Sequence, residues 1–289
     1  MSKSADLPKL WTHEPHDYLV YREGDKVANL DTSATPGFKG KKSDAAELQP
    51  ERNERFAELQ EMLYANSKSA DDNRSLLLVL QGMDTAGKGG IVKHVVGSVN
   101  PMGVRYTAFG VPTEEERKHN YLWRIRRALP PAGHIGVFDR SHYEDVLIVR
   151  VHNMVPPEVW GKRYDEINKF EKTLVDDGVT IIKVAMFVSL DEQKKQLLER
   201  LEDPTKYWKY NPGDIDERKM WPKYQEAYQA VLDRTSTDYA PWYVVPCDRR
   251  WYSRLAATEL LLDALEGLDL SWPPADFDIE AEKKRLADA

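Results

Sequence analysis

The sequence predicts an α/β protein of three layers, in which helices cover both faces of a mostly parallel, five-stranded sheet. Three observations lead to this prediction. Short, almost continuous aliphatic runs recur along the 289 residues, long stretches with helical periodicity separate them, and a glycine-rich turn directly follows the first run. Buried strands that alternate with helices are typical of repeated strand–helix–strand units, whose strands are parallel.

Composition divides the chain into three parts. Residues 1–70 are an N-terminal extension, which has no sustained period up to about residue 50 and is expected to wrap the surface. One amphipathic helix is predicted over residues 51–65, with apolar side chains at helical spacing: Phe56, Leu59, Met62 and Leu63. Residues 71–270 are the core domain, and residues 271–289 are a C-terminal tail.

The core domain is predicted to contain the sheet and most of the helices. Strands are predicted at residues 75–82, 103–109, 134–139, 179–190 and 241–246. Helices are predicted at about residues 113–128, 157–177, 190–202, 217–235 and 250–266. Because the first run is aliphatic throughout, its strand should be buried on both faces.

Composition also excludes several classes of protein. A formal net charge of -7 argues against a protein that coats nucleic acid, since that needs a basic surface. The single cysteine, Cys247, cannot form an internal disulfide, and no Cys and His cluster has the spacing of a structural zinc site. The first residues lack the apolar core of a signal peptide, and no segment approaches the roughly 20 apolar residues of a membrane span. We therefore expect a cytoplasmic protein that binds neither nucleic acid nor a membrane.

The glycine-rich turn indicates a phosphate site. Residues 82–90, GMDTAGKGG, satisfy the first seven positions of the motif GxxxxGK[ST] between a strand and a helix. Backbone N–H groups in such a loop surround a phosphate, the next helix points its positive end there, and Lys88 adds a full charge. The predicted phosphate contacts are Gly82, Ala86, Gly87, Lys88, Gly89, Gly90 and, in the helix, Lys93. The alternative is a structural glycine-rich turn with an exposed lysine.

Two carboxylates are predicted to bind Mg²⁺, with Mn²⁺ as a possible substitute. Gly89 stands where such loops carry the hydroxyl that ligates the metal, so another group must hold it. Asp84, inside the loop, would repel phosphate unless a divalent cation lay between them. Asp139 ends the third strand, where enzymes with this loop keep a second metal-binding acid. The alternative for Asp84 is a carboxylate that bonds its own loop backbone.

The turn after the third strand carries further candidates. Arg140 is costly to bury without an anion, so it should contact phosphate or, as the alternative, pair with Asp84 or Glu144. Glu144 and Asp145 could orient an acceptor or metal waters, or cap the following helix. His142 is expected to be structural, because direct phosphoryl transfer needs no protein nucleophile.

A substrate rich in phosphate needs several cations. Arg117 and Arg124, in the predicted helix after the second strand, are candidates for binding a nucleotide together with Glu144. Other basic residues cluster in the same region, although most charges on helices are simply solvated: Arg105, Lys118, Arg126 and Arg127.

A polar loop, interrupted by proline, covers about residues 200–216 between two helices, where phosphate-transferring enzymes close a lid over the reacting group. Arg200 and Lys209 would be its closing cations. The alternative is an ordinary connection between helices.

Three segments resemble the family-2 polyphosphate kinases, which are P-loop kinases related in fold to thymidylate kinase. GMDTAGKGG is similar to the altered Walker A motif of that family, FDRSHYEDVL to its Walker B segment, and EDPTKYWKYNPGDIDERKMWPKY to its lid and the following helix. The resemblance runs from about Glu47 to Leu268. It implies a P-loop kinase fold with a helical lid and an N-terminal helical extension.

The resemblance also implies site roles and an activity. Asp84 and Asp139 would bind magnesium, Lys88 and Arg140 would hold the transferring phosphates, and Arg200 would act from the lid; these are the predicted catalytic residues. The terminal phosphate of inorganic polyphosphate would move reversibly to ADP or GDP.

The acceptor and the donor each have a second interpretation. Asp139 resembles members that act on either diphosphates or monophosphates, whereas HYEDVL looks like the members that act on both, so AMP is an alternative acceptor. An ATP-dependent kinase of the thymidylate type and a binding module without chemistry also stay open. A homo-oligomer, either a dimer or a tetramer, is implied by the resemblance and by the aromatic residues that we expect to be exposed in the N-terminal extension.

Overall fold

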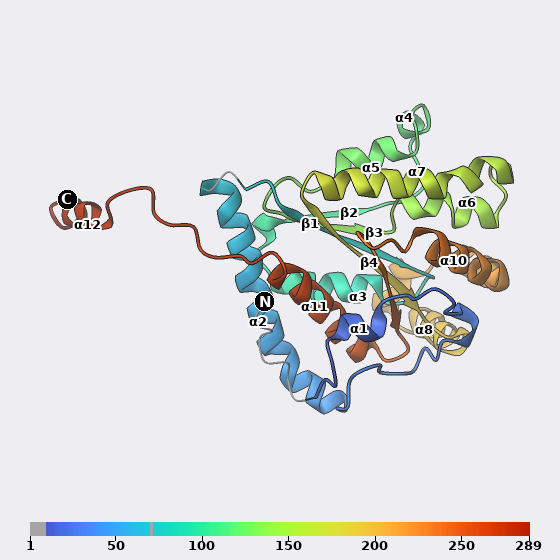
Figure 1. Ribbon diagram of the computed structural model, residues 1–289. Coiled ribbons are helices and arrows are strands. Elements are labelled where there is room, and N and C mark those ends of the chain that lie inside the picture. Colours follow the sequence, from blue (N-terminus) through green and yellow to red (C-terminus); the bar gives the residue numbers. More distant parts are fainter. Residues whose placement is uncertain (1–9, 70–71) are drawn as a thin grey trace.

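A five-stranded parallel sheet forms the centre of the molecule (Figure 1). The computed structural model describes residues 10–69 and 72–289. The strands are β1 (Ser75–Gly82), β2 (Val104–Ala108), β3 (Ile135–Asp139), β4 (Val179–Phe187) and β5 (Trp242–Pro246). Their spatial order is β2-β3-β1-β4-β5, so the predicted parallel sheet is confirmed.

The register of the sheet brings two chemically important segments to one edge. Strand β1 lies between β3 and β4, and Leu80 of β1 is opposite Asp139, the last residue of β3. The glycine-rich turn that follows β1 therefore lies beside the end of β3. In open parallel sheets, ligands bind at the carboxyl ends of the strands, where the strand order reverses.

Helices cover both faces of the sheet (Figure 1). On one face lie α2 (Lys42–Ser69), α3 (Lys88–His94) and α11 (Arg250–Glu266), and on the other α5 (Leu122–Ala128), α7 (Pro157–Asp176) and α10 (Trp221–Thr235). Successive side chains of β1 alternate between the two cores, with Leu76 and Leu78 in the first and Leu77 and Val79 in the second. The continuous aliphatic run of β1 is thus explained by burial on both faces.

The N-terminal helix is longer than predicted. Helix α2 begins at Lys42, well before the predicted start at residue 51, and continues through Pro50. Ala45 and Leu48 extend the buried stripe of the four predicted apolar residues, all of which are buried. Within α2, only these two residues before Pro50 are buried, which is too few to give a clear helical period.

The segment before α2 packs along the edge strand β5. It contains α1 (Pro15–Leu19) and a short 3₁₀ turn, Val27–Asn29, and Val20 bridges to Tyr243 of β5. Trp11 and Tyr21 are buried, so the expectation of exposed aromatic residues was wrong for both, whereas Tyr18 is exposed. Trp11 and Tyr21 therefore offer no exposed aromatic surface for contact with a second subunit. Residues 1–9 of the predicted extension lie outside the described part.

Two predicted helices are each divided. The helix predicted at 113–128 is two helices, α4 (Glu114–Arg117) and α5, because the side chain of Asn120 accepts a hydrogen bond from the backbone N–H of Leu122 at 2.9 Å and starts a new helix. The helix predicted at 217–235 covers the end of α9 (Gly213–Lys219), which begins inside the predicted lid, and all of α10, whose first turn holds Pro222.

The remaining helices and turns lie between these elements or, for α12, near the C-terminal end of the chain. They are α6 (Ile148–Val151), α8 (Leu190–Glu202), α12 (Ile279–Ala287) and the 3₁₀ turns Val96–Ser98, Pro101–Gly103, His142–Asp145 and Pro204–Lys209. Helix α12 was not predicted; it has no buried residue and lies away from the body of the protein (Figure 1). Across residues 10–69 and 72–289, the search for a helix of the length and apolarity of a membrane span finds none.

Candidate active site

The loop between β1 and α3 is a tight cradle. Gly87 precedes α3 in the left-handed region, with φ of 106°, and a Cβ atom at Gly82 would lie 2.7 Å from the carbonyl oxygen of Met186. The Lys88 Nζ donates a hydrogen bond to the carbonyl oxygen of Gly82 at 2.6 Å, and its residue is only 9% exposed. The alternative of an exposed lysine is therefore wrong: the ammonium group is held inside the loop.

Thr85 is a loop residue that the sequence reasoning did not single out. Its backbone is in the left-handed region with φ of 69°, which is unfavourable for a β-branched residue. Its Oγ1 is buried, and no hydrogen-bond partner for it exists among the described residues. The signal available in the sequence was a threonine inside the glycine-rich loop. A buried hydroxyl without a partner, in a loop of this kind, suits a phosphate oxygen.

Replacing Thr85 with Gly tests this backbone strain. We expect the free energy of unfolding to rise by about 1 kcal/mol, because glycine adopts positive φ without a steric penalty. Urea denaturation of both proteins measures the difference. Turnover should fall, since the variant has lost the loop hydroxyl; a less stable variant would contradict the strain.

Arg140 joins the loop to the turn after β3. Its Nη2 lies 3.1 Å from Oδ1 of Asp84, so the ion-pair alternative describes this state, and the Asp84 carboxylate bonds Arg140 instead of capping its own loop. Although burial opposes the charge, the carboxylates of Glu144, Asp84 and Asp139 raise the pKa of Arg140 above its usual value. Asp84 therefore contacts the guanidinium group, and Glu144 and Asp139 lie near enough to stabilise its charge.

The two predicted metal ligands fit a hard divalent cation. Asp84 follows β1 and Asp139 ends the adjacent strand β3, and both offer carboxylate oxygens, the ligands that Mg²⁺ and Mn²⁺ prefer. The hydroxyl of Tyr106 lies 3.4 Å from Oδ2 of Asp139, and burial together with this carboxylate raises the pKa of Tyr106. Gly89 supplies no hydroxyl, so these two acids are the metal candidates of the loop and the strand end.

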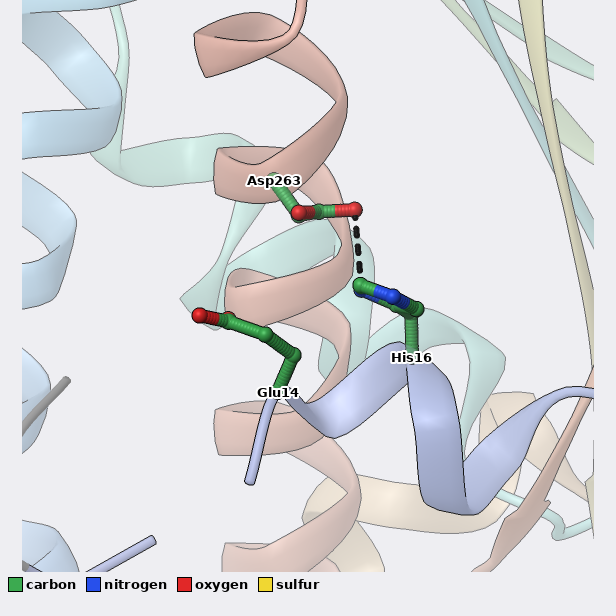
Figure 2. Close-up of side chains that lie close together, drawn as sticks. All are labelled: Glu14, His16 and Asp263. Atoms are coloured by element: carbon green, nitrogen blue, oxygen red, sulfur yellow. Dashed lines mark ion pairs between the residues drawn. The ribbon is translucent and has the colours of Figure 1, made fainter. Parts of the chain in front are cut away.

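A different cluster of possible metal ligands lies on the N-terminal segment. Among the described residues, Glu14, His16 and Asp263 form the group of three whose ligand atoms all lie within 4.8 Å of one another (Figure 2). His16 Nδ1 lies 3.2 Å from Oδ2 of Asp263. This cluster joins the start of α1 to α11, and none of its three residues comes from the phosphate loop or from the turn after β3.

The acids that follow Arg140 take separate positions. Glu144 is partly buried near the loop; burial raises its pKa, while Arg140 and Lys88 oppose that rise. Asp145 instead accepts a hydrogen bond from Nη1 of Arg163 at 3.0 Å. Glu144 therefore faces the candidate site and Asp145 binds α7.

A buried polar network anchors the turn that carries these groups. Nε2 of His142 lies 3.1 Å from Oε1 of Glu171, and the hydroxyl of Tyr143 donates to the same oxygen at 2.7 Å. Lys183 donates to Oε2 of Glu171 and to the carbonyl oxygen of Thr235, both at 2.7 Å. Although burial opposes ionisation, Lys183 and His142 lower the pKa of Glu171. His142 is completely buried, as expected for a structural histidine.

A cavity of about 220 Å³ opens beside the loop. Its walls come from the loop, from the turn after β3 and from the region predicted as a lid, and include Gly82, Asp84, Arg140, Glu144, Asp214 and Tyr224. Burial and the charge of Asp84 raise the pKa of Asp214, so the carboxylate of the loop and that of the region predicted as a lid repel each other. The open cavity is thus lined by the loop, the turn after β3 and part of the region predicted as a lid, together with Tyr224 of α10.

The region predicted as a lid is fastened by its own ion pair. Nη1 of Arg200 lies 3.2 Å from Oδ2 of Asp214 and donates to the carbonyl oxygen of Lys209 at 3.0 Å. Gln193, which we did not predict, donates to the carbonyl oxygen of Asp84 at 3.1 Å and accepts from Arg218 of α9 at 3.0 Å. Helix α9, which begins inside the region predicted as a lid, is therefore joined to the loop through the buried Gln193.

The other predicted cations lie outside this cavity. Arg117 is exposed at the end of α4, and Arg124 is buried, where its Nη1 donates to the carbonyl oxygen of Gly110 at 2.9 Å. Lys93 is exposed on α3, and Lys209 is exposed with its ammonium group over the ring of Trp208. The nucleotide roles of Arg117 and Arg124 stay predictions.

Comparisons with known proteins agree on one family. The profile of the family described as Polyphosphate kinase 2 matches residues 41–271. An AMP/ADP-polyphosphate phosphotransferase from Meiothermus ruber is 46% identical over 257 residues, which are 89% of this chain and 94% of that protein. An ADP-polyphosphate phosphotransferase from Rhodopseudomonas palustris is 38% identical over 265 residues, 87% of this chain and 90% of that protein. The crystal structure of Polyphosphate Kinase 2 from Arthrobacter aurescens superposes with a TM-score of 0.94 at 49% identity, covering 96% of this chain and 98% of that one.

Proposed function

The chain belongs to the polyphosphate kinase 2 family, and from this premise we propose that it moves the terminal phosphoryl group of inorganic polyphosphate to ADP or GDP, reversibly and with Mg²⁺. It is a P-loop kinase in fold and a polyphosphate-dependent nucleotide phosphotransferase in activity. The observation that carries the assignment of the site is the ion pair of Arg140 with Asp84 at 3.1 Å, beside the loop that holds Lys88. Glu144 and Asp139 lie near enough to stabilise the same guanidinium group.

The chemistry requires positioning and charge stabilisation. A terminal oxygen of the nucleoside diphosphate attacks the end phosphorus of polyphosphate, the bond from that phosphorus to the next bridging oxygen breaks, and the polymer leaves one unit shorter. No general base is needed, because a diphosphate oxygen is already ionised at neutral pH. The loop N–H groups and Lys88 would hold the transferring phosphate and spread its charge.

Two ion pairs supply further cations. Arg140, paired with Asp84 at 3.1 Å, would exchange this carboxylate for a phosphate oxygen, and Arg200 would do the same from its pair with Asp214. A Mg²⁺ ion on Asp84 and Asp139 would neutralise phosphate charge and orient the two phosphate groups. Closure of the lid segment over the cavity would exclude water, so that the phosphoryl group reaches the nucleotide.

The acceptor is tested with a nucleotide panel. Purified protein, polyphosphate and Mg²⁺ should convert ADP to ATP and GDP to GTP with no ATP added, as measured by chromatography of the products. An ATP-dependent kinase of the thymidylate type would form no ATP in this assay, and a binding module would retain polyphosphate without turnover. AMP is the second candidate acceptor, because the 46% identical relative is named for both AMP and ADP.

Two further properties belong to this proposal. A homo-oligomer, either a dimer or a tetramer, is proposed from the family resemblance, and light scattering of the purified protein measures it. A cytoplasmic location is proposed because nucleoside diphosphates are found there, and fractionation of cells that produce the protein tests it.

A further inference from the structure

One buried glutamine connects a residue predicted to bind the metal to a helix that lines the same cavity. Gln193 lies on α8 and is only 2% exposed. Its Nε2 donates a hydrogen bond to the carbonyl oxygen of Asp84 at 3.1 Å, and its Oε1 accepts one from Nη1 of Arg218, on α9, at 3.0 Å. We call this chain of contacts, from Arg218 through Gln193 to the Asp84 carbonyl, the amide link.

The chemistry of the two partners requires an amide at position 193. A backbone carbonyl can only accept a hydrogen bond, and a guanidinium group can only donate one. The side chain between them must therefore donate at one end and accept at the other, which an ionised carboxylate or an ammonium group cannot do. The same constraint fixes the orientation of the amide, because the reverse orientation would leave both buried contacts unsatisfied.

The α9 end of the amide link is held in place. Nη1 of Arg218 also donates to the carbonyl oxygen of Leu190, the first residue of α8, at 2.7 Å. The Ser189 side chain caps the same helix by accepting a hydrogen bond from the backbone N–H of Glu192 at 3.1 Å. A shift of α9 therefore moves Arg218 against the start of α8 and changes its contact with Gln193.

The loop end of the amide link lies next to the carboxylate that would bind Mg²⁺. Gly82 and Gly87 flank this part of the loop, and glycine leaves the backbone free to adopt several conformations. Thr85, the residue after Asp84, is strained at φ of 69°. A hydrogen bond to the Asp84 carbonyl fixes that peptide group, and with it the direction of the Asp84 side chain.

Helix α9 and the loop line the same cavity. Gly213, Asp214 and Glu217 of α9 lie in its wall together with Asp84, whereas Arg218 lies outside it. A nucleotide or a phosphate chain in this cavity would therefore contact both elements. The amide link makes the positions of the two elements depend on each other.

We propose that Gln193 is a positioning residue for the metal site: through the amide link, the place of α9 sets the orientation of Asp84 and thus the affinity for the divalent cation. This inference rests on the proposed function, which assigns Asp84 to the cation. Gln193 itself binds neither the cation nor a phosphate. Removing a group that holds a metal ligand in place typically changes metal affinity or activity by about 10- to 100-fold.

Two substitutions interrupt the amide link at different points. Gln193→Met keeps the length of the side chain without its amide, and Arg218→Met removes the partner on α9. We expect each to raise the Kd for Mn²⁺ about tenfold, measured by electron paramagnetic resonance with ADP present. The Mg²⁺ concentration for half-maximal turnover should rise by a similar factor, while the KM for ADP at saturating Mg²⁺ stays the same. Arg218→Met is the sharper test, because the loss of a positive charge would by itself strengthen cation binding.

The double variant Gln193→Met/Arg218→Met tests whether the two residues act as one unit. Because both changes interrupt the same link, the double variant should bind Mn²⁺ about as weakly as Gln193→Met alone. Independent effects would multiply to a loss of about 100-fold, and that result would overturn the inference. Asp84→Asn should remove the titrated Mn²⁺ site altogether; a site that persists in this variant would also overturn it.

The matched control is Gln229→Met. Gln229, on α10, also joins two segments, since it accepts a hydrogen bond from the backbone N–H of Val27 and donates one to the carbonyl oxygen of Asp25. The control should lower the melting temperature about as much as Gln193→Met does, and it should leave the Mn²⁺ affinity unchanged. An unchanged Kd for Mn²⁺ in Gln193→Met, or an equal rise in the control, would overturn the inference.

The proposed function and the amide link fail by different results. If the unchanged protein forms no ATP from polyphosphate and ADP, the proposed function fails, while the Mn²⁺ titration still tests the amide link. If Gln193→Met does not fold, Arg218→Met, at a half-buried position, carries the same prediction.

Discussion

Replacing Asp84 with Asn should lower turnover with polyphosphate and ADP by about 1,000-fold or more while the protein stays folded. The amide keeps the shape of the side chain and removes the charge that would hold Mg²⁺ and that pairs with Arg140 at 3.1 Å. The Asp84 side chain is 32% exposed, so its loss costs little stability. Initial rates over a range of Mg²⁺ concentrations, together with circular dichroism, measure both effects.

The matched control is Asp165→Asn. Asp165 is a highly exposed residue of α7, and its Oδ1 lies 3.8 Å from Nη2 of Arg234. Its rates should equal those of the unchanged protein. Near-normal turnover of Asp84→Asn at ordinary Mg²⁺ concentration would rule out Asp84 as a metal ligand, whatever the control shows.

The second large effect is on stability. Replacing Glu171 with Gln should lower the free energy of unfolding by about 3–5 kcal/mol, because it leaves Lys183 charged, buried and without its carboxylate. The substitution also weakens the contacts of His142 and Tyr143, which hold the turn after β3. Urea denaturation measures the loss, and Glu158→Gln, an exposed change on the same helix, should change stability by less than about 1 kcal/mol.

The pH dependence of stability gives this prediction a sign. The pKa of Glu171 is lowered in the folded protein, so its contribution is present above the ordinary carboxyl pKa and is lost as the pH falls through the folded value. Glu171→Gln should lack this loss in acid. The double variant Glu171→Gln/Lys183→Met should be more stable than Glu171→Gln alone, since it removes the unpaired charge. Equal stabilities would contradict the expected cost of an unpaired Lys183 charge.

The central strand and its loop could be read from the sequence because their signals are local. Strand β1 has the predicted bounds, since residues 75–82 are aliphatic enough for two buried faces and end in glycine. The position of Lys88 at the start of α3 followed from the motif. The division between α4 and α5 was missed because it depends on one side chain, Asn120, that competes with the helix for a backbone N–H.

The sequence predicted most residues of the candidate site, but not which side chains they contact. Arg140 was expected to meet either phosphate or a carboxylate, and only the fold shows that Asp84 reaches it. The pair of Arg200 with Asp214 and the contact of Gln193 with the loop depend on packing between distant segments. Gln193 looks like any polar residue on a solvated helix face, so its burial could not be inferred from periodicity.

The claim that two carboxylates, and not a loop hydroxyl, hold the divalent cation is tested most directly by anomalous diffraction. Crystals of the protein with Mn²⁺, ADP and polyphosphate should show an anomalous peak bonded to carboxylate oxygens of both Asp84 and Asp139, next to the phosphate in the loop. A peak that contacts neither acid, or a structure in which the two acids face away from the loop, would contradict the account.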